Sequence, residues 1–305
     1  MGWRASSSPP ELGASAAPDV PRRGPSLFST GLGYPQLPLV LSDCPQAGCS
    51  AFLTGGMGPT VGDMTTAHII GVVGGSGGVG ASALTAAIAV RGAQAGLRTV
   101  CLDGDRLGGG LDVTLGVEQE RGVRWPDLSG ARGRIDGPEL LRALPTVDGV
   151  AVLSFDRARD VHLAPEILHE VLAALSRATD LVVIDLPRPD HEVFGAFSPS
   201  LDAIVLLAGS GICDLAGASS IAENLIPSCP DVWLCLRSGG KGGPFAETVA
   251  VALDLPLLAI LREEPALAAD LLHGIPPGTS PKGAMAAAAD TVLAHFVVGA
   301  RRDAS

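Results

Sequence analysis

The 305-residue chain has few aromatic residues, which make up 4% of it, and it has no excess of basic residues. Its formal net charge is -11 at pH 7. The scarcity of aromatic side chains argues against a base-stacking platform for single-stranded nucleic acid. The acidic balance disfavours non-specific contact with nucleic acid or anionic lipid. We therefore expect no specific nucleic-acid partner.

Paired cysteine motifs and long apolar runs are also missing. The six cysteines form no C-x-x-C pair, and four of them lie in or beside apolar segments, which predicts reduced, packed thiols and no metal centre. No apolar run reaches about 18 residues, so no membrane-spanning helix is expected. The N-terminus lacks the basic-then-apolar order of a signal peptide. These features predict a cytoplasmic protein.

Residues 1–66 are rich in Pro, Gly, Ser and Ala and follow neither helical nor strand periodicity. Such a composition is typical of a disordered leader. Met57 and Met64 offer later start positions, in which case part of this leader is not made. The main domain is expected over residues 67–300, followed by a polar tail over residues 301–305.

From His68 onward, short apolar runs alternate with segments of helical character. Strands are expected over 69–73, 99–102, 150–154, 181–185, 203–208, 232–237 and 257–261. Helices are expected over 81–95, 138–144, 165–177, 214–226, 245–252 and 284–298. Near-continuous apolar strands separated by amphipathic helices predict an α/β fold, doubly wound, with a mostly parallel sheet covered by helices on both faces. Ligand is then expected at the carboxyl ends of the strands.

The first apolar run leads into a glycine-rich loop over residues 74–82. Glycines allow the backbone to turn tightly and to bring its amide N–H groups against phosphate oxygens. The loop fits the phosphate-binding pattern G-x-x-x-x-G-K-(S/T) at Gly75, Gly80 and Ser82, whose hydroxyl would bind magnesium. Ala81 stands where that pattern has the lysine that reaches the phosphates. The sequence therefore predicts a phosphate cradle without its cation.

Acidic residues follow two of the predicted strands. Asp103 and Asp105 end the second strand, and Asp185 closes the run LVVID, which has the form of a Walker B strand. Such an aspartate usually holds magnesium together with the loop hydroxyl, here Ser82. Each acid alone could simply cap the turn after its strand. Their order behind the glycine loop favours a magnesium-nucleotide site.

A second interpretation concerns the same glycines. Gly75, Gly77 and Gly80 also satisfy the dinucleotide fingerprint G-x-G-x-x-G, and Asp103 lies about where a ribose-binding acid would stand. A dinucleotide-binding oxidoreductase is therefore an alternative. Ser82 and the Asp185 strand are not required by such a site.

Several segments together carry a family resemblance. They are the glycine loop, DGD at 103–105, GGGLDVTLG at 108–116 and VVIDLPR at 182–188. In this order they resemble the MinD/ParA group of deviant Walker P-loop ATPases, and the resemblance covers residues 68–300. The segments VAVLSFDRA at 150–158 and LREEPALAADLLHGIPP at 261–277 resemble the CpaE-like, septum-site-determining (Ssd) branch found in actinobacteria beside Tad/Flp pilus secretion genes.

The resemblance implies a role for each loop position. The group's loop KGGxGK(S/T) aligns with Ser76-Gly77-Gly78-Val79-Gly80-Ala81-Ser82. Ser76 stands where the signature lysine would reach a partner's nucleotide, and Ala81 where the in-cis lysine would be.

The same resemblance assigns the remaining site residues. Ser82, Asp103 and Asp185 are the implied magnesium ligands, and Asp105 is the implied catalytic residue if the site is active. Arg237 falls near the group's adenine contact.

The implied cofactor is ATP or ADP with magnesium. Loss of both lysines implies weak binding and weak or absent hydrolysis, unless Lys241 or Arg188 supplies a substitute cation for a slow ATPase. The resemblance implies protein partners in a division or pilus-secretion apparatus, with a homodimer as one option. The tail with Arg301 and Arg302 lacks a long basic amphipathic face, so contact with the inner membrane is at most peripheral.

Overall fold

The computed structural model describes residues 66–298, apart from 132, 230 and 241. The predicted leader up to residue 65, with Cys44 and Cys49, lies outside the described residues, as do Lys241 and the tail with Arg301 and Arg302.

Within the described residues, eight strands form one sheet in the order β3-β4-β2-β5-β1-β6-β7-β8. The strands are β1 (His68–Gly74), β2 (Thr99–Asp103), β3 (Thr146–Val147), β4 (Val150–Leu153), β5 (Leu181–Asp185), β6 (Ala203–Gly209), β7 (Val232–Ser238) and β8 (Leu257–Arg262). The short edge strand β3 pairs antiparallel with β4, and the pairings from β4 to β8 are parallel. The carboxyl ends of the parallel strands therefore meet at one edge of the sheet.

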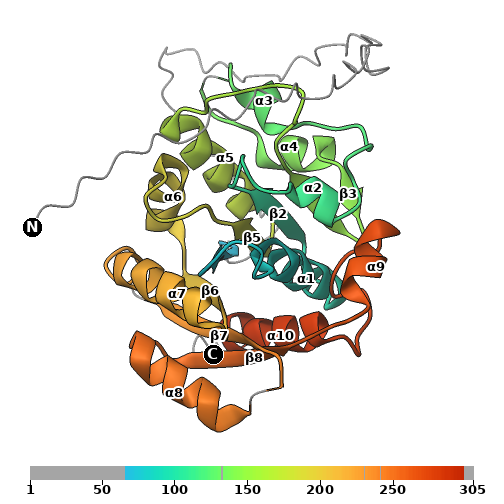
Figure 1. The fold of residues 1–305 in the computed structure, drawn as a ribbon. Coiled ribbons are helices and arrows are strands. Elements are labelled where there is room, and N and C mark those ends of the chain that lie inside the picture. The colour runs from blue at the N-terminus through green and yellow to red at the C-terminus, as the bar shows by residue number, and fades with distance from the viewer. Residues whose placement is uncertain (1–65, 132, 230, 241, 299–305) are drawn as a thin grey trace, which may run out of the picture. The chain divides into compact units, whose positions relative to one another are not determined.

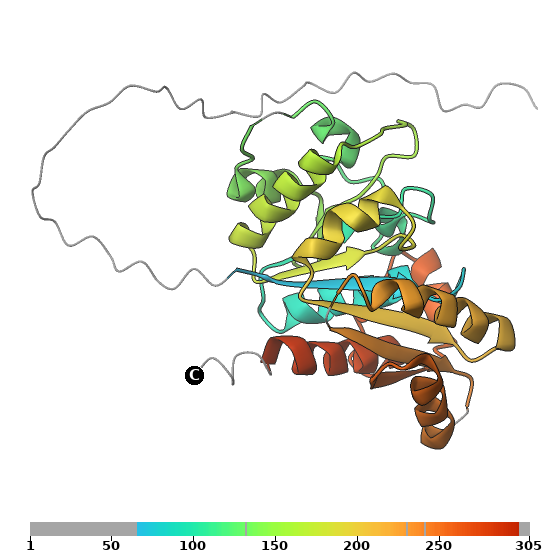
Figure 2. The ribbon, with the colours of Figure 1, turned by 90° about the vertical axis from the view of Figure 1, so that its left-hand side faces the viewer.

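Helices cover both faces of this sheet, as predicted (Figures 1 and 2). The helices α1 (Ala81–Gln94) and α10 (Ala284–Leu293) lie on one face. On the other face lie α5 (Pro165–Ala178), α6 (Glu192–Phe197), α7 (Ile212–Leu225) and α8 (Gly243–Leu253). The shorter helices are α2 (Leu111–Thr114), α3 (Trp125–Leu128), α4 (Gly137–Ala143) and α9 (Leu267–Leu272), with turns η1 (Ser198–Ser200) and η2 (Ala294–Val298).

The central strands are buried because helices cover them from both sides. All five residues of β5 are buried between β1 and β2, and α1 contributes a run of small and aliphatic side chains to the same core. Ile70 and Val72 of β1 pack there with Leu84 and Ile88 of α1. Burial of each such aliphatic side chain stabilises the fold by roughly 1.5–3 kcal/mol. This core fixes the start of α1 at the carboxyl edge of β1.

The predicted strands agree with the structure to within one residue at their ends. The helices predicted at 81–95, 138–144, 165–177, 214–226 and 245–252 are present with end shifts of one or two residues. The helix predicted over 284–298 is α10 followed by the π-helical turn η2. Among the described residues, no helix is long and apolar enough to cross a membrane.

One expectation about the cysteines was wrong. Cys101, Cys229 and Cys235 are buried free thiols, as predicted for packed cysteines, but Cys213 is exposed. Cys213 lies in the first turn of α7, just after the chain leaves the sheet at the carboxyl end of β6. Apolar neighbours in the sequence did not bury it, because a helix start at a sheet edge has one open side.

Candidate functional site

The glycine-rich loop joins β1 to α1 at the carboxyl edge of the sheet. Gly78 and Gly80 adopt positive φ angles of 76° and 104°, which L side chains rarely accept. The amide of Gly75 donates to the Leu207 carbonyl of β6 at 2.8 Å, which ties the loop to the neighbouring strand. Helix α1 begins at Ala81 without a side-chain cap. Its first amides are thus left for an anion, as in a phosphate cradle.

Helix α7 packs directly on this loop. A Cβ atom on Gly75 would lie 2.8 Å from Cβ of Ala218, and one on Gly217 would lie 2.6 Å from the Gly75 carbonyl oxygen. Small residues at these positions allow the close approach. The Ser76 hydroxyl donates to Oδ1 of Asp214 at 2.7 Å. Ser76, which stands at the signature lysine position, is therefore bonded within its own chain.

Arg237 reaches the loop from the end of β7. Its Nη1 donates to the Val79 carbonyl at 3.0 Å, while Nε and Nη2 donate to the two carboxylate oxygens of Glu263 at 3.1 and 2.7 Å. The guanidinium thus bridges the loop and the end of β8. Arg188, which with Lys241 was predicted as a substitute cation, is exposed after β5.

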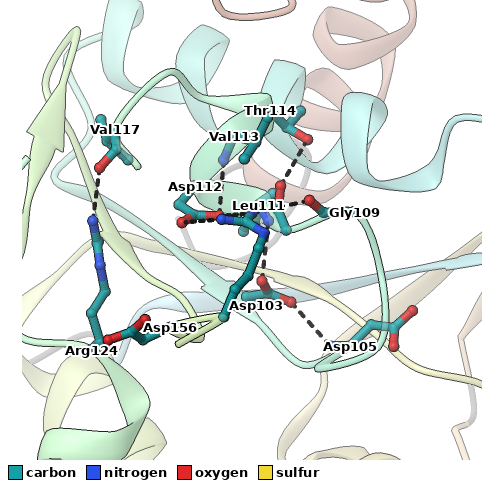
Figure 3. A network of polar contacts seen from close by, with 12 residues as sticks. Asp103, Asp105, Gly109, Leu111, Asp112, Val113, Thr114, Val117, Arg124 and Asp156 are labelled. Carbon is teal, nitrogen blue, oxygen red and sulfur yellow. Dashed lines mark hydrogen bonds and ion pairs between the residues drawn. The ribbon is translucent and has the colours of Figure 1, made fainter. Parts of the chain in front are cut away.

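Two carboxylates lie side by side beyond the loop. Asp103 ends β2 and Asp185 ends β5, and the two residues are direct neighbours in the parallel register. Their side chains are almost fully buried, with 1% and 5% of each residue exposed. Asp103 accepts the amides of Asp105 and Leu111, each at 3.1 Å, which fixes the loop that follows β2 (Figure 3). The Ser82 hydroxyl contacts the Asp185 carboxylate.

Burial controls the ionisation of this pair. Burial, together with the charge of the neighbouring Asp185, raises the pKa of Asp103 to about 8. Burial also raises the pKa of Asp185 to about 7, opposed by its hydrogen bond with Ser82. Two neighbouring buried carboxylates, one of which contacts the Ser82 hydroxyl, form an oxygen donor set that suits a hard divalent cation.

The protein donors fit magnesium better than a cation that needs a complete protein cage. Among the described residues, no three His, Cys, Asp or Glu side chains group as a metal site. Magnesium usually binds one or two carboxylates and completes its octahedron with waters and substrate phosphates. Ser82 and Asp185 would hold it directly. Asp103 would not bind the ion directly, because its two oxygens already accept backbone amides; it would contribute negative charge next to Asp185.

A second polar network holds the segment after Asp105. Arg157 donates to both oxygens of the buried Asp112, at 2.7 and 3.3 Å, and to the Gly109 carbonyl at 3.0 Å. The indole of Trp125, which is fully buried, donates to the Asp103 carbonyl at 2.7 Å. These contacts brace the acidic end of β2 from the loop after β4 and from α3.

Arg124 adds a buried positive charge beneath this network. Its Nη2 donates to the Val117 carbonyl at 2.7 Å (Figure 3), and burial lowers the pKa of its guanidinium against the opposing effect of Asp112. The acidic cluster therefore has its positive charges on the β4 side, away from the glycine loop.

Solved structures with a similar fold include a ParA family ATPase and MinD proteins. A ParA family ATPase from Chlorobium tepidum matches with a TM-score of 0.66 and 16% identity, covering 75% of this chain and 98% of that one. The septum site-determining protein MinD of Pyrococcus horikoshii, complexed with Mg-ADP, matches with a TM-score of 0.63 and 23% identity, covering 77% and 97%. The chain has the MinD/ParA P-loop ATPase fold.

The MinC:MinD cell division complex of Aquifex aeolicus also has this MinD/ParA fold, with a TM-score of 0.61 and 20% identity over 76% of this chain and 96% of that one. No family model matches the sequence.

Relatives are also found by sequence. Uncharacterised proteins from two strains of Mycobacterium tuberculosis are each 35% identical over 206 residues. That match takes in 68% of this chain, which spans 57% of the length of each of these relatives. An uncharacterised ATP-binding protein of Methanocaldococcus jannaschii is 25% identical over 244 residues, or 77% of this chain and 89% of that protein.

The MinD/ParA fold brings most of the predicted site residues to one edge. Ser82, Asp103, Asp105 and Asp185 meet there, and Arg237 touches the loop. Sequence reasoning missed partners of these residues, which are Asp112, Trp125, Arg157, Asp214 and Glu263. Among these partners, only the position of Asp214 could be inferred from the sequence. It lies in the first helical turn after the buried strand β6 and the glycines Gly209 and Gly211.

Proposed function

We propose that the protein is a MinD/ParA-fold regulator with a degenerate nucleotide site. It acts through protein partners in positioning a septum or a Tad/Flp pilus-secretion apparatus, as a member of the CpaE-like Ssd branch, in the cytoplasm or peripherally at the inner membrane. One observation carries the proposal. The magnesium side of the site is assembled from Ser82, Asp103 and Asp185, whereas Ser76 and Ala81 replace both cations of the phosphate side.

The residues present can bind a nucleotide more readily than hydrolyse it. The loop amides would hold the phosphates, and magnesium would supply charge neutralisation between Ser82 and the phosphate oxygens. A charge-assisted hydrogen bond contributes roughly 1.5–3 kcal/mol, and phosphoryl transfer depends almost wholly on such electrostatic positioning. Asp105 could orient the attacking water, but with alanine at position 81 no lysine would stabilise the charge of the transition state. Hydrolysis is therefore weak or absent.

The similar proteins support a nucleotide and a protein partner. The Pyrococcus horikoshii neighbour is a complex with Mg-ADP, and the Methanocaldococcus jannaschii relative is named as ATP-binding. The Aquifex aeolicus neighbour is a complex of MinD with MinC. A homodimer remains part of the proposal, since a P-loop at an open sheet edge can face a second copy.

The dinucleotide alternative is poorly supported by the acid that would bind ribose. Asp103 is 1% exposed, and both of its oxygens accept backbone amides. A ribose hydroxyl would have to reach a carboxylate that is already enclosed. These contacts disfavour a dinucleotide-binding oxidoreductase.

One observation favours a slow ATPase with a substitute cation as a second candidate. Arg237 is held against the loop by Glu263 and contacts the Val79 carbonyl. If this guanidinium supplies charge to a bound phosphate, Arg237→Gln should weaken Mg-ATP binding about tenfold. If Arg237 only braces the loop, the affinity should change less than twofold.

The main experiment restores the missing cation. Calorimetric titration of wild type and Ala81→Lys with Mg-ATP should show about tenfold tighter binding in the variant, equal to about 1.4 kcal/mol. Ser76 still lacks a charge, so turnover need not return. An unchanged affinity in a folded variant would show either that the loop does not face a nucleotide or that another cation already fills the role of the lysine.

Hydrolysis is tested separately with Asp185→Ala as the matched control. Steady-state phosphate release from the wild type should not exceed that of this variant. A clear Asp185-dependent turnover of about 1 per minute or faster would favour the slow ATPase instead.

A further inference from the structure

Asp214 places a carboxylate at the glycine loop, outside every role assigned so far. It lies in the first turn of α7, and its Oδ1 accepts the Ser76 hydroxyl at 2.7 Å. A Cβ atom on Gly209 or Gly211 would lie 2.6 or 2.8 Å from Oδ2 of Asp214. One oxygen of this carboxylate therefore lies close to the backbone of Gly209 and Gly211, and the other is hydrogen-bonded to Ser76 of the glycine loop.

This carboxylate has no cationic partner in the part of the chain that the structure describes. The ion pairs of the described residues all involve acidic residues other than Asp214. Arg237, the cation that contacts the glycine loop, is paired with Glu263. An aspartate carries a negative charge near pH 7. A negative charge fixed beside a phosphate cradle repels an anion, and the repulsion grows with the charge of that anion.

We propose that Asp214 is a specificity-determining residue that directs the loop toward a nucleoside diphosphate and against the triphosphate. This inference rests on the proposed nucleotide function and deepens it. The magnesium complex of a nucleoside triphosphate carries about one more negative charge than that of the diphosphate. Asp214 penalises that extra charge, and no loop lysine offsets the penalty.

Three variants separate the charge of Asp214 from its hydrogen bond. Asp214→Asn keeps an Oδ1 acceptor for Ser76 and removes the charge. Ser76→Ala removes the hydrogen bond and keeps the charge. Asp254→Asn is the control, because it removes one negative charge at the opposite edge of the sheet, between the end of α8 and the start of β8. Asparagine suits this position, since the backbone of Asp254 is left-handed with a φ of 52°.

Calorimetric titrations with Mg-ADP and Mg-ATP at low and high salt provide the test. In Asp214→Asn, Mg-ATP binding should tighten about tenfold and Mg-ADP binding about threefold. The gain should shrink at high salt, since salt screens charge repulsion and leaves a purely structural effect in place. Ser76→Ala and Asp254→Asn should show no such gain. If Asp214→Asn does not fold, Asp214→Ser serves for the same comparison.

The outcomes separate this inference from the function on which it rests. If the wild type binds nucleotides and Asp214→Asn keeps the same ratio of ATP to ADP affinity, the inference is overturned and the nucleotide site stands. An equal gain in Ser76→Ala would also overturn it, because the hydrogen bond would then be responsible. If neither the wild type, Ala81→Lys nor Asp214→Asn binds either nucleotide, the proposed function fails together with the inference.

Discussion

The two halves of the proposed nucleotide site differ in the side chains that they contain. On the magnesium side, Asp103 and Asp185 are buried neighbours at the ends of β2 and β5, with Ser82 beside them. On the proposed phosphate side, the glycine loop has the backbone turn that a cradle requires, but Ser76 and Ala81 stand where the MinD/ParA pattern has lysines. The backbone of a cradle depends on glycines and on packing against α7, so it can persist without its charges. The geometry of a phosphate loop is therefore separable from its chemistry.

The difference also leaves an electrostatic imbalance. Among the described residues, no lysine pairs with the buried acids, and the cations of the acidic network are Arg124 and Arg157 on the β4 side. Buried carboxylates without a nearby cation oppose folding in their ionised form. The following substitutions test how each half depends on close packing and on charge.

The largest effect is expected from a methyl group at Gly104 on the acidic side. A Cβ atom there would lie 2.7 Å from the carbonyl oxygen of Asp185, the last residue of β5. It would lie 3.2 Å from Cδ of Pro187, two residues further along the chain. Gly104→Ala should lower the stability by about 2–4 kcal/mol and the Tm by roughly 5–10 °C. Thermal unfolding measures this change.

Gly109→Ala is the matched control in the same loop, because nothing lies within 4 Å of its Cβ position. Its stability should stay within about 0.5 kcal/mol of the wild type. Equal losses in the two variants would mean that the loop after β2 does not press on β5 as described.

The second effect concerns charge on the acidic side. The folded-state pKa values of Asp103 and Asp185 are raised to about 8 and about 7 from an ordinary 3.8. The native state therefore holds protons that the unfolded chain has released. The stability from these groups is fully present below about pH 4 and is lost as the pH rises through 7 and 8. Denaturant unfolding from pH 5 to pH 8.5 without magnesium should show this decline.

Asp185→Asn should remove part of that decline and raise the stability at pH 8 by about 1–3 kcal/mol. Asparagine fits here because its carbonyl can still accept the Ser82 hydroxyl. It would not fit at Asp103, where both oxygens accept amides. A variant with the same pH dependence as the wild type would show that Asp185 does not hold a proton in the folded chain.

A smaller effect is expected on the phosphate side. A Cβ atom on Gly75 would meet Cβ and Cα of Ala218 at 2.8 and 3.1 Å, whereas one on Gly77 would have nothing within 4 Å. Gly75→Ala should cost about 1–2 kcal/mol, since α7 can shift slightly to relieve the contact. Gly77→Ala should be nearly neutral in the same thermal melts. Destabilisation by Gly77→Ala instead would show that the outer loop is packed more tightly than its contacts indicate.

Long elements of the fold were predictable from sequence, and short ones were not. The run LVVID gave β5 its full length, because a continuous apolar segment closed by an acid leaves little freedom in its bounds. The helices α2, α3, α6 and α9 have four to six residues, too few to show a helical period. The edge strand β3 has two residues and no pattern at all.

The site divides in the same way. Residues on one local motif, such as Ser82 and Asp185, could be assigned because each motif carries its own chemistry. The contact of Asp214 with Ser76 could not be predicted, because it joins residues 138 positions apart. Such pairs follow from the strand order, in which β6 lies beside β1. Strand order is a property of the whole sheet and is not written in any one segment.

The indole of Trp125 gives this site an optical reporter. The chain has three tryptophans, of which Trp3 lies outside the described residues and Trp233 is only partly buried, near His295. Trp125 donates its indole proton to the carbonyl of Asp103 in a fully enclosed setting. Because indole emission depends on the local electric field, a charge arriving between Asp103 and Asp185 would change its colour and intensity. Events at the site could then be followed by fluorescence, with no added dye.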